Sequence, residues 1–184
     1  MAIDESRMFR PINIALLTVS DTRGPEDDTS GDLLAARITG AGHALVSRTI
    51  LKDDADLIAR QLRTWIADPA VDAVISTGGT GLTGRDVTPE ALDRVKESGG
   101  GRDIEGFGEL FRMLSFKTIG TSTIQSRATA GVAGGTYLFA LPGSPGACRD
   151  AWDLILKDQL DIRHKPCNFA ELLPRLTEHL PKAG

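Results

Sequence analysis

The segment over residues 12–19, INIALLTV, constrains the fold most strongly, because it is almost wholly apolar and rich in branched side chains. A strand with this pattern is buried on both faces, as at the centre of a parallel sheet. Residues 44–50, 71–76 and 136–141 are the other strand candidates. We therefore expect a sheet in which residues 12–19 lie centrally.

Segments with helical signals alternate with these strands. Thr29 and Asp32 have the spacing of a capping box ahead of a helix over residues 30–39. Thr88 followed by Pro89 is typical of an N-cap and a first helical residue. Further helices are expected after Asp54, around residues 107–116 and from Ser144 onward, the second of them being core or else a subunit interface. Alternating strands and helices predict an α/β protein with a mostly parallel sheet and helices on both faces.

Composition excludes several classes of protein. The 184 residues suit one domain, and a net charge of −4 provides no basic field, so nucleic acid is not an expected partner. No apolar run approaches the roughly 18 residues of a membrane span, and the N-terminus lacks a signal-peptide core, so we expect a cytoplasmic protein with no membrane partner. Cys148, Cys167 and the scattered histidines lack the spacing of a zinc site.

Four glycines lie in the sequence VISTGGTGLTGRDVTPE, at positions 78, 79, 81 and 84. GTGLTG matches a dinucleotide-binding pattern, but Thr88 and Pro89 delay the helix by several residues, and no Gly-Lys-Ser/Thr follows as in a P-loop. Glycines nevertheless permit positive φ and leave backbone N–H groups open to an anion such as phosphate. The alternative is a tight irregular turn without a ligand.

Arg85 and then Asp86 follow the last of these glycines. A carboxylate beside bound phosphate requires an intervening cation, and Mg²⁺ accepts one or two carboxylates together with phosphate oxygens. Asp53 or Asp54 is a candidate for the second carboxylate, unless it merely caps the following helix. No Ser/His/Asp or Cys/His constellation is evident, which favours nucleotidyl transfer to an already ionised phosphate by alignment and charge neutralisation.

Several motifs together resemble one known family. TVSDT with DDTSG, STGGTGLTGRDVTPEAL and LPGSPGA are similar to the molybdopterin-binding MoaB/MogA family of molybdenum cofactor biosynthesis, which includes the G domain of gephyrin. EGFGELFRMLSF, GTSTIQSRA and KPCNF resemble its MoaB branch. The resemblance implies a three-layer α/β/α sandwich, with an N-terminal extension over residues 1–11, the molybdopterin-binding domain over 12–169 and a C-terminal tail over 170–184.

The resemblance also implies an activity, the transfer of AMP from Mg-ATP to the terminal phosphate of molybdopterin. Asp53 and Asp86 match the catalytic and Mg²⁺-binding acids, although Lys52 replaces the usual proline and Asp54 stays open as the second acid. Thr77 to Gly81 would hold phosphate, and Ser126 with residues 142–144 would line the pterin side. The substrate-binding residues implied in this way are Ser20, Asp21, Ser30, Thr77, Gly78, Gly79, Thr80, Gly81, Arg85, Ser126, Pro142, Gly143 and Ser144.

The expected partners are ATP, molybdopterin, further copies of the chain in a trimer or hexamer, and other molybdenum cofactor biosynthesis proteins. Some members of the MoaB branch lack the acids, so the alternative function is a non-catalytic molybdopterin-binding or carrier protein. A third reading, an NAD-dependent oxidoreductase, predicts nicotinamide binding that is insensitive to Mg²⁺.

Overall fold

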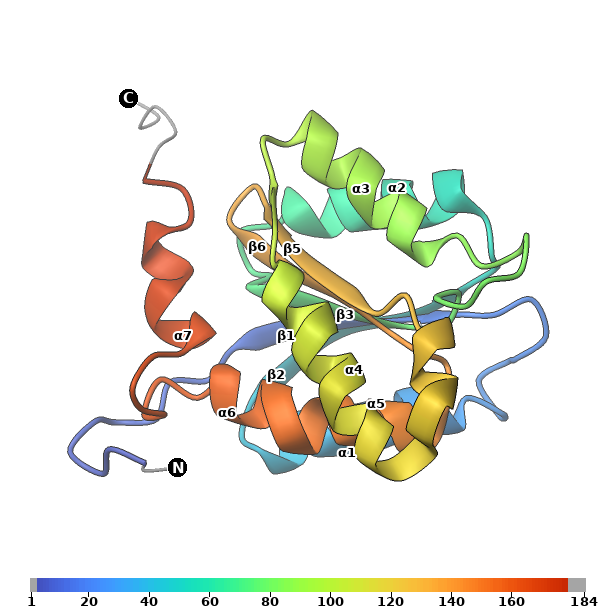
Figure 1. Ribbon diagram of the computed structural model, residues 1–184. Coiled ribbons are helices and arrows are strands. Elements are labelled where there is room, and N and C mark those ends of the chain that lie inside the picture. Colours follow the sequence, from blue (N-terminus) through green and yellow to red (C-terminus); the bar gives the residue numbers. More distant parts are fainter. Residues whose placement is uncertain (1–2, 179–184) are drawn as a thin grey trace.

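A computed structural model describes residues 3–178, in which one six-stranded sheet lies between two layers of helices (Figure 1). The strand order is β2-β1-β3-β6-β5-β4. β1, β2, β3 and β6 are parallel, whereas β5 is antiparallel to β6 and β4 is antiparallel to β5. The strands are β1 (Asn13–Val19), β2 (Ala44–Leu51), β3 (Ala73–Thr77), β4 (Arg102–Asp103), β5 (Thr129–Ala133) and β6 (Thr136–Leu141). The mostly parallel sheet and the three-layer α/β/α class are confirmed.

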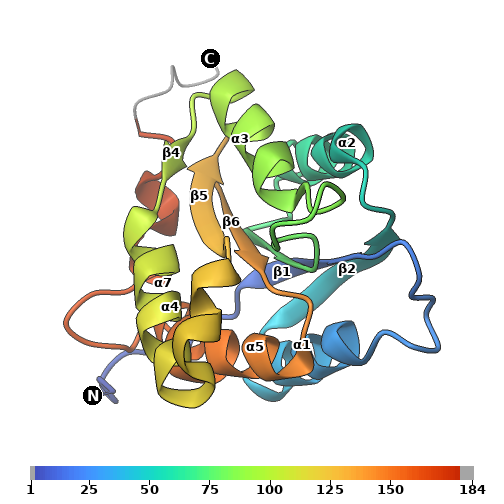
Figure 2. The ribbon, with the colours of Figure 1, turned by 45° about the vertical axis from the view of Figure 1, so that its right-hand side comes forward.

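Helices α2 and α3 cover one face of the sheet, and α1, α4 and α5 cover the other (Figures 1 and 2). The 3-10 helix η1 follows α4, and α5 continues through the π-helical turn η2 into α6. The helical elements are α1 (Thr29–Gly40), α2 (Ala55–Ile66), α3 (Thr88–Ser98), α4 (Glu105–Ile119), η1 (Gly120–Gln125), α5 (Pro145–Ala151), η2 (Trp152–Leu156), α6 (Lys157–Gln159), α7 (Phe169–Leu172) and η3 (Leu173–Arg175).

Strand β1 explains why the sequence is apolar at nearly every position there. Ile14 and Leu16 are buried under α1, α4 and α5, and Ala15 and Leu17 are buried under α2 and α3. Successive side chains of a strand point to opposite faces, so both sets enter a core. Among residues 3–178, none of the helices combines the length and apolarity needed to cross a bilayer.

Two further predictions concern the chain ends and the α4 helix. Residues 1–2 of the predicted extension and 179–184 of the predicted tail lie outside the described residues. On α4, Phe107 and Phe111 are core residues, whereas Met113 and Phe116 are more than half exposed. The core reading of this helix therefore holds for one face, and the expected homo-oligomer stays a prediction.

Two helix starts differ from the sequence prediction. The N-cap of α1 is Asp28, not Thr29, because the Asp28 carboxylate accepts the Gly31 N–H at 2.9 Å. The N-cap position of α3 is Val87, and Thr88 is already helical. The Thr88 hydroxyl instead donates a hydrogen bond to the Gly78 carbonyl oxygen at 2.8 Å. The cap of α1 thus shifts by one residue but stays local, whereas in α3 a tertiary contact to the glycine loop replaces the predicted cap.

The Asp28 carboxylate joins three elements at the carboxyl end of the sheet. It is fully buried and also accepts hydrogen bonds from Thr18 Oγ1 and Arg48 Nη2, both at 2.8 Å. Burial opposes ionisation, but the bonds from Arg48, Thr18 and Gly31 outweigh it and lower the pKa of Asp28 below its usual value. The ionised carboxylate therefore stabilises the contact between β1, β2 and the start of α1.

We expect Asp28→Asn to lower the free energy of unfolding at pH 7 by about 2 kcal/mol, because hydrogen bonds to a buried charge are lost. Since the folded-state pKa lies below the unfolded-state value of about 3.9, the contribution of Asp28 is complete above that value and is lost as the pH falls through the folded-state pKa. The difference between wild type and variant in urea denaturation should be constant from pH 7 to about 5 and shrink below about 4.

The matched control is Asp32→Asn, because Asp32 also pairs with Arg48, at 2.7 Å, but its side chain is largely exposed. Asp32→Asn should therefore lower the free energy of unfolding at pH 7 by less than Asp28→Asn does. An Asp28→Asn difference that grew on acidification would contradict the assignment.

Candidate functional site

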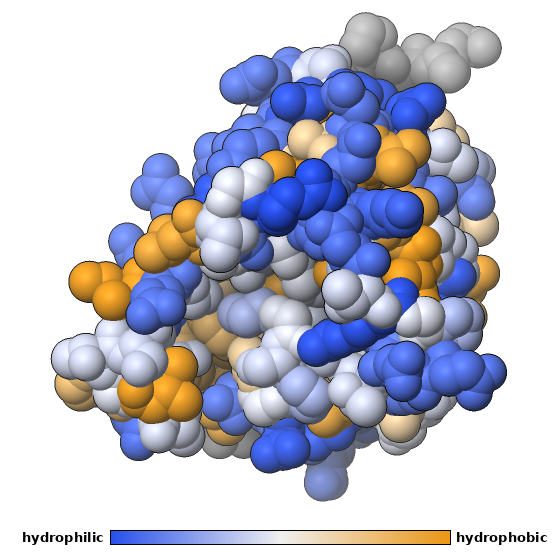
Figure 3. Space-filling view, turned by 90° about the vertical axis from the view of Figure 1, so that its right-hand side faces the viewer, coloured by the Kyte–Doolittle hydropathy of each residue, from blue (hydrophilic) through white to orange (hydrophobic). Residues whose placement is uncertain are grey.

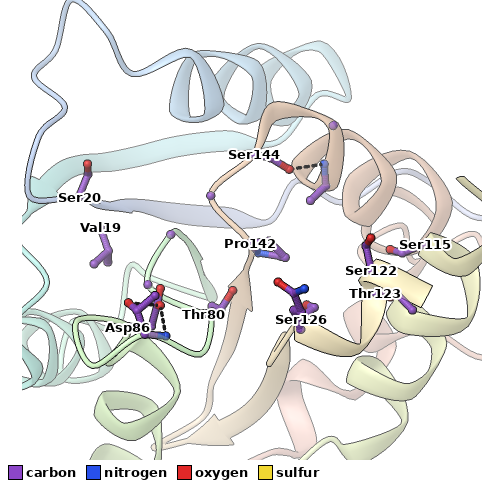
Figure 4. Close-up of a pocket in the computed structure, with 18 of the residues that line it drawn as sticks. Val19, Ser20, Thr80, Asp86, Ser115, Ser122, Thr123, Ser126, Pro142 and Ser144 are labelled. Carbon is purple, nitrogen blue, oxygen red and sulfur yellow. Dashed lines mark hydrogen bonds between the residues drawn. The ribbon is translucent and has the colours of Figure 1, made fainter. Parts of the chain in front are cut away.

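A cleft of about 830 Å³ opens at the carboxyl ends of β1, β3 and β6. In open α/β sheets ligands bind at this edge, and the corresponding face of the molecule is visibly hollowed (Figure 3). The loops that follow these strands supply one side of the cleft, and α4 with η1 supplies the other. Figure 4 shows Thr80, Asp86, Ser126 and Pro142 converging on the cleft from three different segments.

The glycine loop after β3 packs too closely for side chains. Gly78 and Gly79 have φ of 100° and 64°, in the left-handed region that favours glycine. A Cβ on Gly78 would lie 2.1 Å from the Val19 carbonyl oxygen, and one on Gly143 would lie 3.2 Å from the Gly78 Cα. The loop after β6 therefore presses against the loop after β3, backbone to backbone.

The carbonyl groups of Gly78, Gly79 and Thr80 are hydrogen bonded, whereas some N–H groups of this loop are not. Thr88 donates its hydroxyl to Gly78 O and its N–H to Gly79 O, and Arg127 donates its N–H to Thr80 O. Within the described residues, no hydrogen bond is formed by the backbone N–H of Gly79 or Thr80. Two donors thus stay open at the edge of the cleft, as an anion site requires.

The carboxylates of Asp53 and Asp86 approach the same loop from two sides. A Cβ on Gly79 would lie 2.8 Å from Asp53 Oδ1, and one on Gly81 would lie 2.8 Å from Asp86 Oδ2. Asp86 Oδ2 accepts the N–H of Thr83 at 2.8 Å and its hydroxyl at 2.6 Å (Figure 4). Both acids line the cleft, so the glycines are needed for carboxylate approach as well as for the turn.

The two acids differ in electrostatic environment. Burial opposes ionisation of Asp86, but the hydrogen bonds from Thr83 outweigh it, so the pKa of Asp86 is lowered. The pKa of Asp53 is raised by burial and then by the negative charges of Asp21 and Asp86. Within the described residues, no three His, Cys, Asp or Glu side chains form a cluster suited to a metal ion. Asp53 and Asp86 are nevertheless two carboxylates of the cleft that lie against the glycine loop.

Asp54 has a different role from Asp53. Asp54 Oδ1 accepts the N–H groups of Asp56 and Leu57 at 2.9 and 3.0 Å and so caps α2. Asp54 is not among the residues that line the cleft. Of the two neighbouring acids, the structure therefore brings only Asp53 to the glycine loop.

Two predicted binding residues are buried behind the cleft and do not line it. Ser30 donates its hydroxyl to the Gly143 carbonyl at 2.7 Å, and Thr77 donates its hydroxyl to the Pro142 carbonyl at 2.9 Å. Both side chains hold the turn after β6 in place. The remaining predicted residues line the cleft, namely Ser20, Asp21, Asp53, Gly78, Gly79, Thr80, Gly81, Arg85, Asp86, Ser126, Pro142, Gly143 and Ser144.

Arg85 is paired within the protein. Its Nε and Nη2 donate to the two carboxylate oxygens of Asp21 at 2.9 and 2.8 Å. These hydrogen bonds lower the pKa of Asp21. The two predicted ligand-binding charges therefore neutralise each other across the mouth of the cleft, where the Arg85 side chain is 67% exposed.

Several residues of the site were missed by sequence reasoning. Arg23 donates from Nη1 to the Gly143 carbonyl at 3.0 Å, and Thr83 holds Asp86. The wall formed by α4 and η1 has no charged side chain in the cleft and consists of Phe111, Ser115, Thr118, Ile119, Ser122, Thr123 and Gln125. The sequence GTSTIQ of η1 has no hydrophobic period, so no signal in it predicted this helix or its place in the cleft.

Comparisons with known proteins show which family the chain belongs to. A family model described as a probable molybdopterin binding domain matches residues 15–162. Molybdenum cofactor biosynthesis protein B of Escherichia coli (strain K12) is 54% identical over 164 residues, which cover 89% of this chain and 94% of that protein.

Solved structures are also similar. A crystal structure of a molybdenum cofactor biosynthesis protein B has a TM-score of 0.82 and 36% identity, covering 94% of this chain and 99% of the other. The tungsten cofactor synthesizing protein MoaB from Pyrococcus furiosus has a TM-score of 0.72 and 31% identity, covering 81% of this chain and 92% of the other. These likenesses confirm the resemblance, and the chain therefore belongs to the MoaB family of molybdenum cofactor biosynthesis proteins and carries their molybdopterin-binding domain.

Proposed function

We propose that this chain is a molybdopterin adenylyltransferase, which binds ATP and molybdopterin in the cleft and transfers AMP to the terminal phosphate of molybdopterin. The observation that carries the proposal is a single juxtaposition. Unpaired backbone N–H groups of Gly79 and Thr80 lie on the loop that the carboxylates of Asp53 and Asp86 approach. Phosphate binding by the donors and cation binding by the acids are complementary there.

The acids fit a magnesium ion. Their oxygens are the hard ligands that Mg²⁺ prefers, and it commonly uses one or two carboxylates with substrate phosphates. The raised pKa of Asp53, caused by burial and by the charges of Asp21 and Asp86, marks a place where a cation would relieve repulsion. When bound, Mg²⁺ would neutralise phosphate charge. Thr83 keeps Asp86 oriented toward the loop by two hydrogen bonds.

The phosphate that accepts AMP needs no strong general base, and this matches a cleft whose described residues offer no histidine or cysteine. A phosphate monoester is already ionised at neutral pH, so attack needs alignment and charge stabilisation more than a general base. Among the described residues that line the cleft there is no histidine and no cysteine. Backbone donors at Gly79 and Thr80 are fixed by the packing of the loop, and they would hold the reacting phosphates without reorganisation.

The wall of α4 and η1 suits the other end of molybdopterin. Ser115, Ser122 and Gln125 offer hydroxyl and amide groups without charge, and Pro142 lies across the cleft (Figure 4). An uncharged bicyclic pterin with alternating donors and acceptors matches this chemistry. We therefore place the pterin between this wall and the turn after β6, with its phosphate toward the glycine loop.

We expect Asp53→Asn and Asp86→Asn each to lower the rate of AMP transfer by about 10²-fold or more, because each removes a charge that acts at the reacting phosphates. Pterin binding should be retained, since neither acid lies on the pterin wall. The measurement is an anaerobic incubation with molybdopterin and Mg-ATP, with adenylylated pterin quantified by chromatography.

Asp54→Asn is the matched control, because asparagine is as good an N-cap as aspartate and Asp54 does not line the cleft. Its transfer rate should equal that of the wild type. If the wild type forms no product but still binds the pterin, the chain is instead a non-catalytic molybdopterin-binding protein.

Metal dependence gives an independent check of the two acids. We expect excess EDTA to abolish transfer, added Mg²⁺ to restore it, and pterin affinity to stay unchanged throughout. Calorimetry should also show that Mg²⁺ strengthens ATP binding in the wild type but not in Asp86→Asn. Transfer that persists in EDTA, or ATP binding that is equally Mg²⁺-dependent in the variant, would contradict the metal site.

A further inference from the structure

Arg127 lies between η1 and β5 and faces the glycine loop across the edge of the cleft. Its Nε donates to the Gly81 carbonyl at 2.7 Å, and its Nη2 donates to the Asp86 carbonyl at 2.8 Å. Its Nη1 pairs with the carboxylate of Glu90 on α3. Every nitrogen of the guanidinium group is therefore engaged, and two of the three hold backbone carbonyls near the two ends of the segment 81–86.

These contacts matter because the other contacts of the segment lie within it or at its exposed surface: Thr83 binds Asp86, and Arg85 pairs with Asp21. Gly81 and Gly84 have no side chains, and glycine loses more conformational freedom on ordering than any other residue. Leu82 is exposed, and Arg85 pairs with Asp21 at the surface, so neither side chain is buried against the core. The loop would otherwise sample many conformations, and only some of them bring Asp86 against the amides of residues 79–81.

The geometry requires an arginine. The guanidinium group is a planar fork that reaches two carbonyls at once, whereas a lysine ammonium is a compact point charge on a flexible stem. Glu90 binds the third nitrogen and thereby fixes the plane of the fork relative to α3. A lysine would keep the charge and lose the bridge between the two carbonyls.

We propose that Arg127 is the positioning residue of the nucleotide-phosphate site, holding the 81–86 loop so that Asp86 and the open amides of Gly79 and Thr80 act on the same phosphate. This inference rests on the proposed function only for its catalytic consequence. Its structural part, the ordering of the loop, holds in the free protein.

The wall of α4 and η1, against which we place the pterin, is held by a different arginine. Arg112 donates from Nη1 to the carbonyls of Ser126 and Ala128, at 3.4 and 3.1 Å, and so supports the chain on either side of Arg127. A change at the Arg127 side chain therefore leaves this support in place. The backbone bond from Arg127 N–H to Thr80 O, at 3.0 Å, is also kept in any variant.

The test compares Arg127→Lys with Arg94→Lys, a matched change at an exposed pair in which Arg94 Nη1 lies 2.6 Å from Asp56 Oδ1. In the free protein, amide hydrogen exchange of the segment 81–88 should be about tenfold faster in Arg127→Lys and unchanged in Arg94→Lys. Glu90→Gln, which keeps an acceptor but loses the charge, should give an intermediate increase.

In the transfer reaction, the Arg127→Lys variant should change the kinetic constants for one substrate and not those for the other. Arg127→Lys should lower kcat/KM for Mg-ATP by about 10- to 100-fold, as misplacement of reacting groups does, while KM for molybdopterin and the melting temperature change little. A purely structural role would instead lower the melting temperature and leave both kinetic constants near wild type at temperatures well below melting.

Failure of this inference is distinguishable from failure of the proposed function. Unchanged exchange of the loop, or full activity in Arg127→Lys, overturns the role of Arg127 and leaves the transferase standing. Absence of product from the wild type overturns the transferase, whereas faster loop exchange together with weaker Mg-ATP binding in Arg127→Lys still supports the positioning role.

Discussion

The contact between Gly78 and the end of β1 is the constraint on which the site depends. Because a Cβ there would lie 2.1 Å from the Val19 carbonyl oxygen, only glycine lets the chain leaving β3 fold back across the neighbouring strand. Gly143 then reaches the Gly78 backbone from β6. Three strand ends thus meet without side chains between them, which leaves a hollow floored by backbone groups and open to small anions.

The charges around this floor follow from the same packing. The missing side chains at Gly79 and Gly81 make room for the carboxylates of Asp53 and Asp86. The hydrogen bonds from Thr83 outweigh the effect of burial and lower the pKa of Asp86. Burial and the neighbouring acids raise the pKa of Asp53. Two acids beside the glycine loop thus have pKa values shifted in opposite directions, a feature that is common at functional sites.

Much of the fold could be predicted from the sequence because it depends on local patterns. The four parallel strands β1, β2, β3 and β6 and the helices α1 to α5 follow from apolar runs, periodicity and capping residues, whereas β4, β5 and η1 were not predicted. The glycine loop follows from composition. What could not be predicted depends on contacts between distant segments. Ser30 and Thr77 support the turn after β6 behind the cleft, and Arg23 and Arg127 bind carbonyls far away in sequence. Side chains that bind backbone carbonyls leave no periodic signal, so neither their partners nor their roles are visible before the chain is folded.

The antiparallel strand β5 explains how such distant segments reach one site. In a parallel sheet every strand starts at the edge opposite the ligand site. Because β5 runs against β6, with Thr129 paired to Ala140, the start of β5 lies beside the end of β6. This reversal brings η1, Ser126 and Arg127 to the carboxyl edge, where they close the cleft that the parallel strands leave open. A parallel strand in the place of β5 would have put both the polar wall and the arginine at the far edge, so the mixed topology is what completes the site.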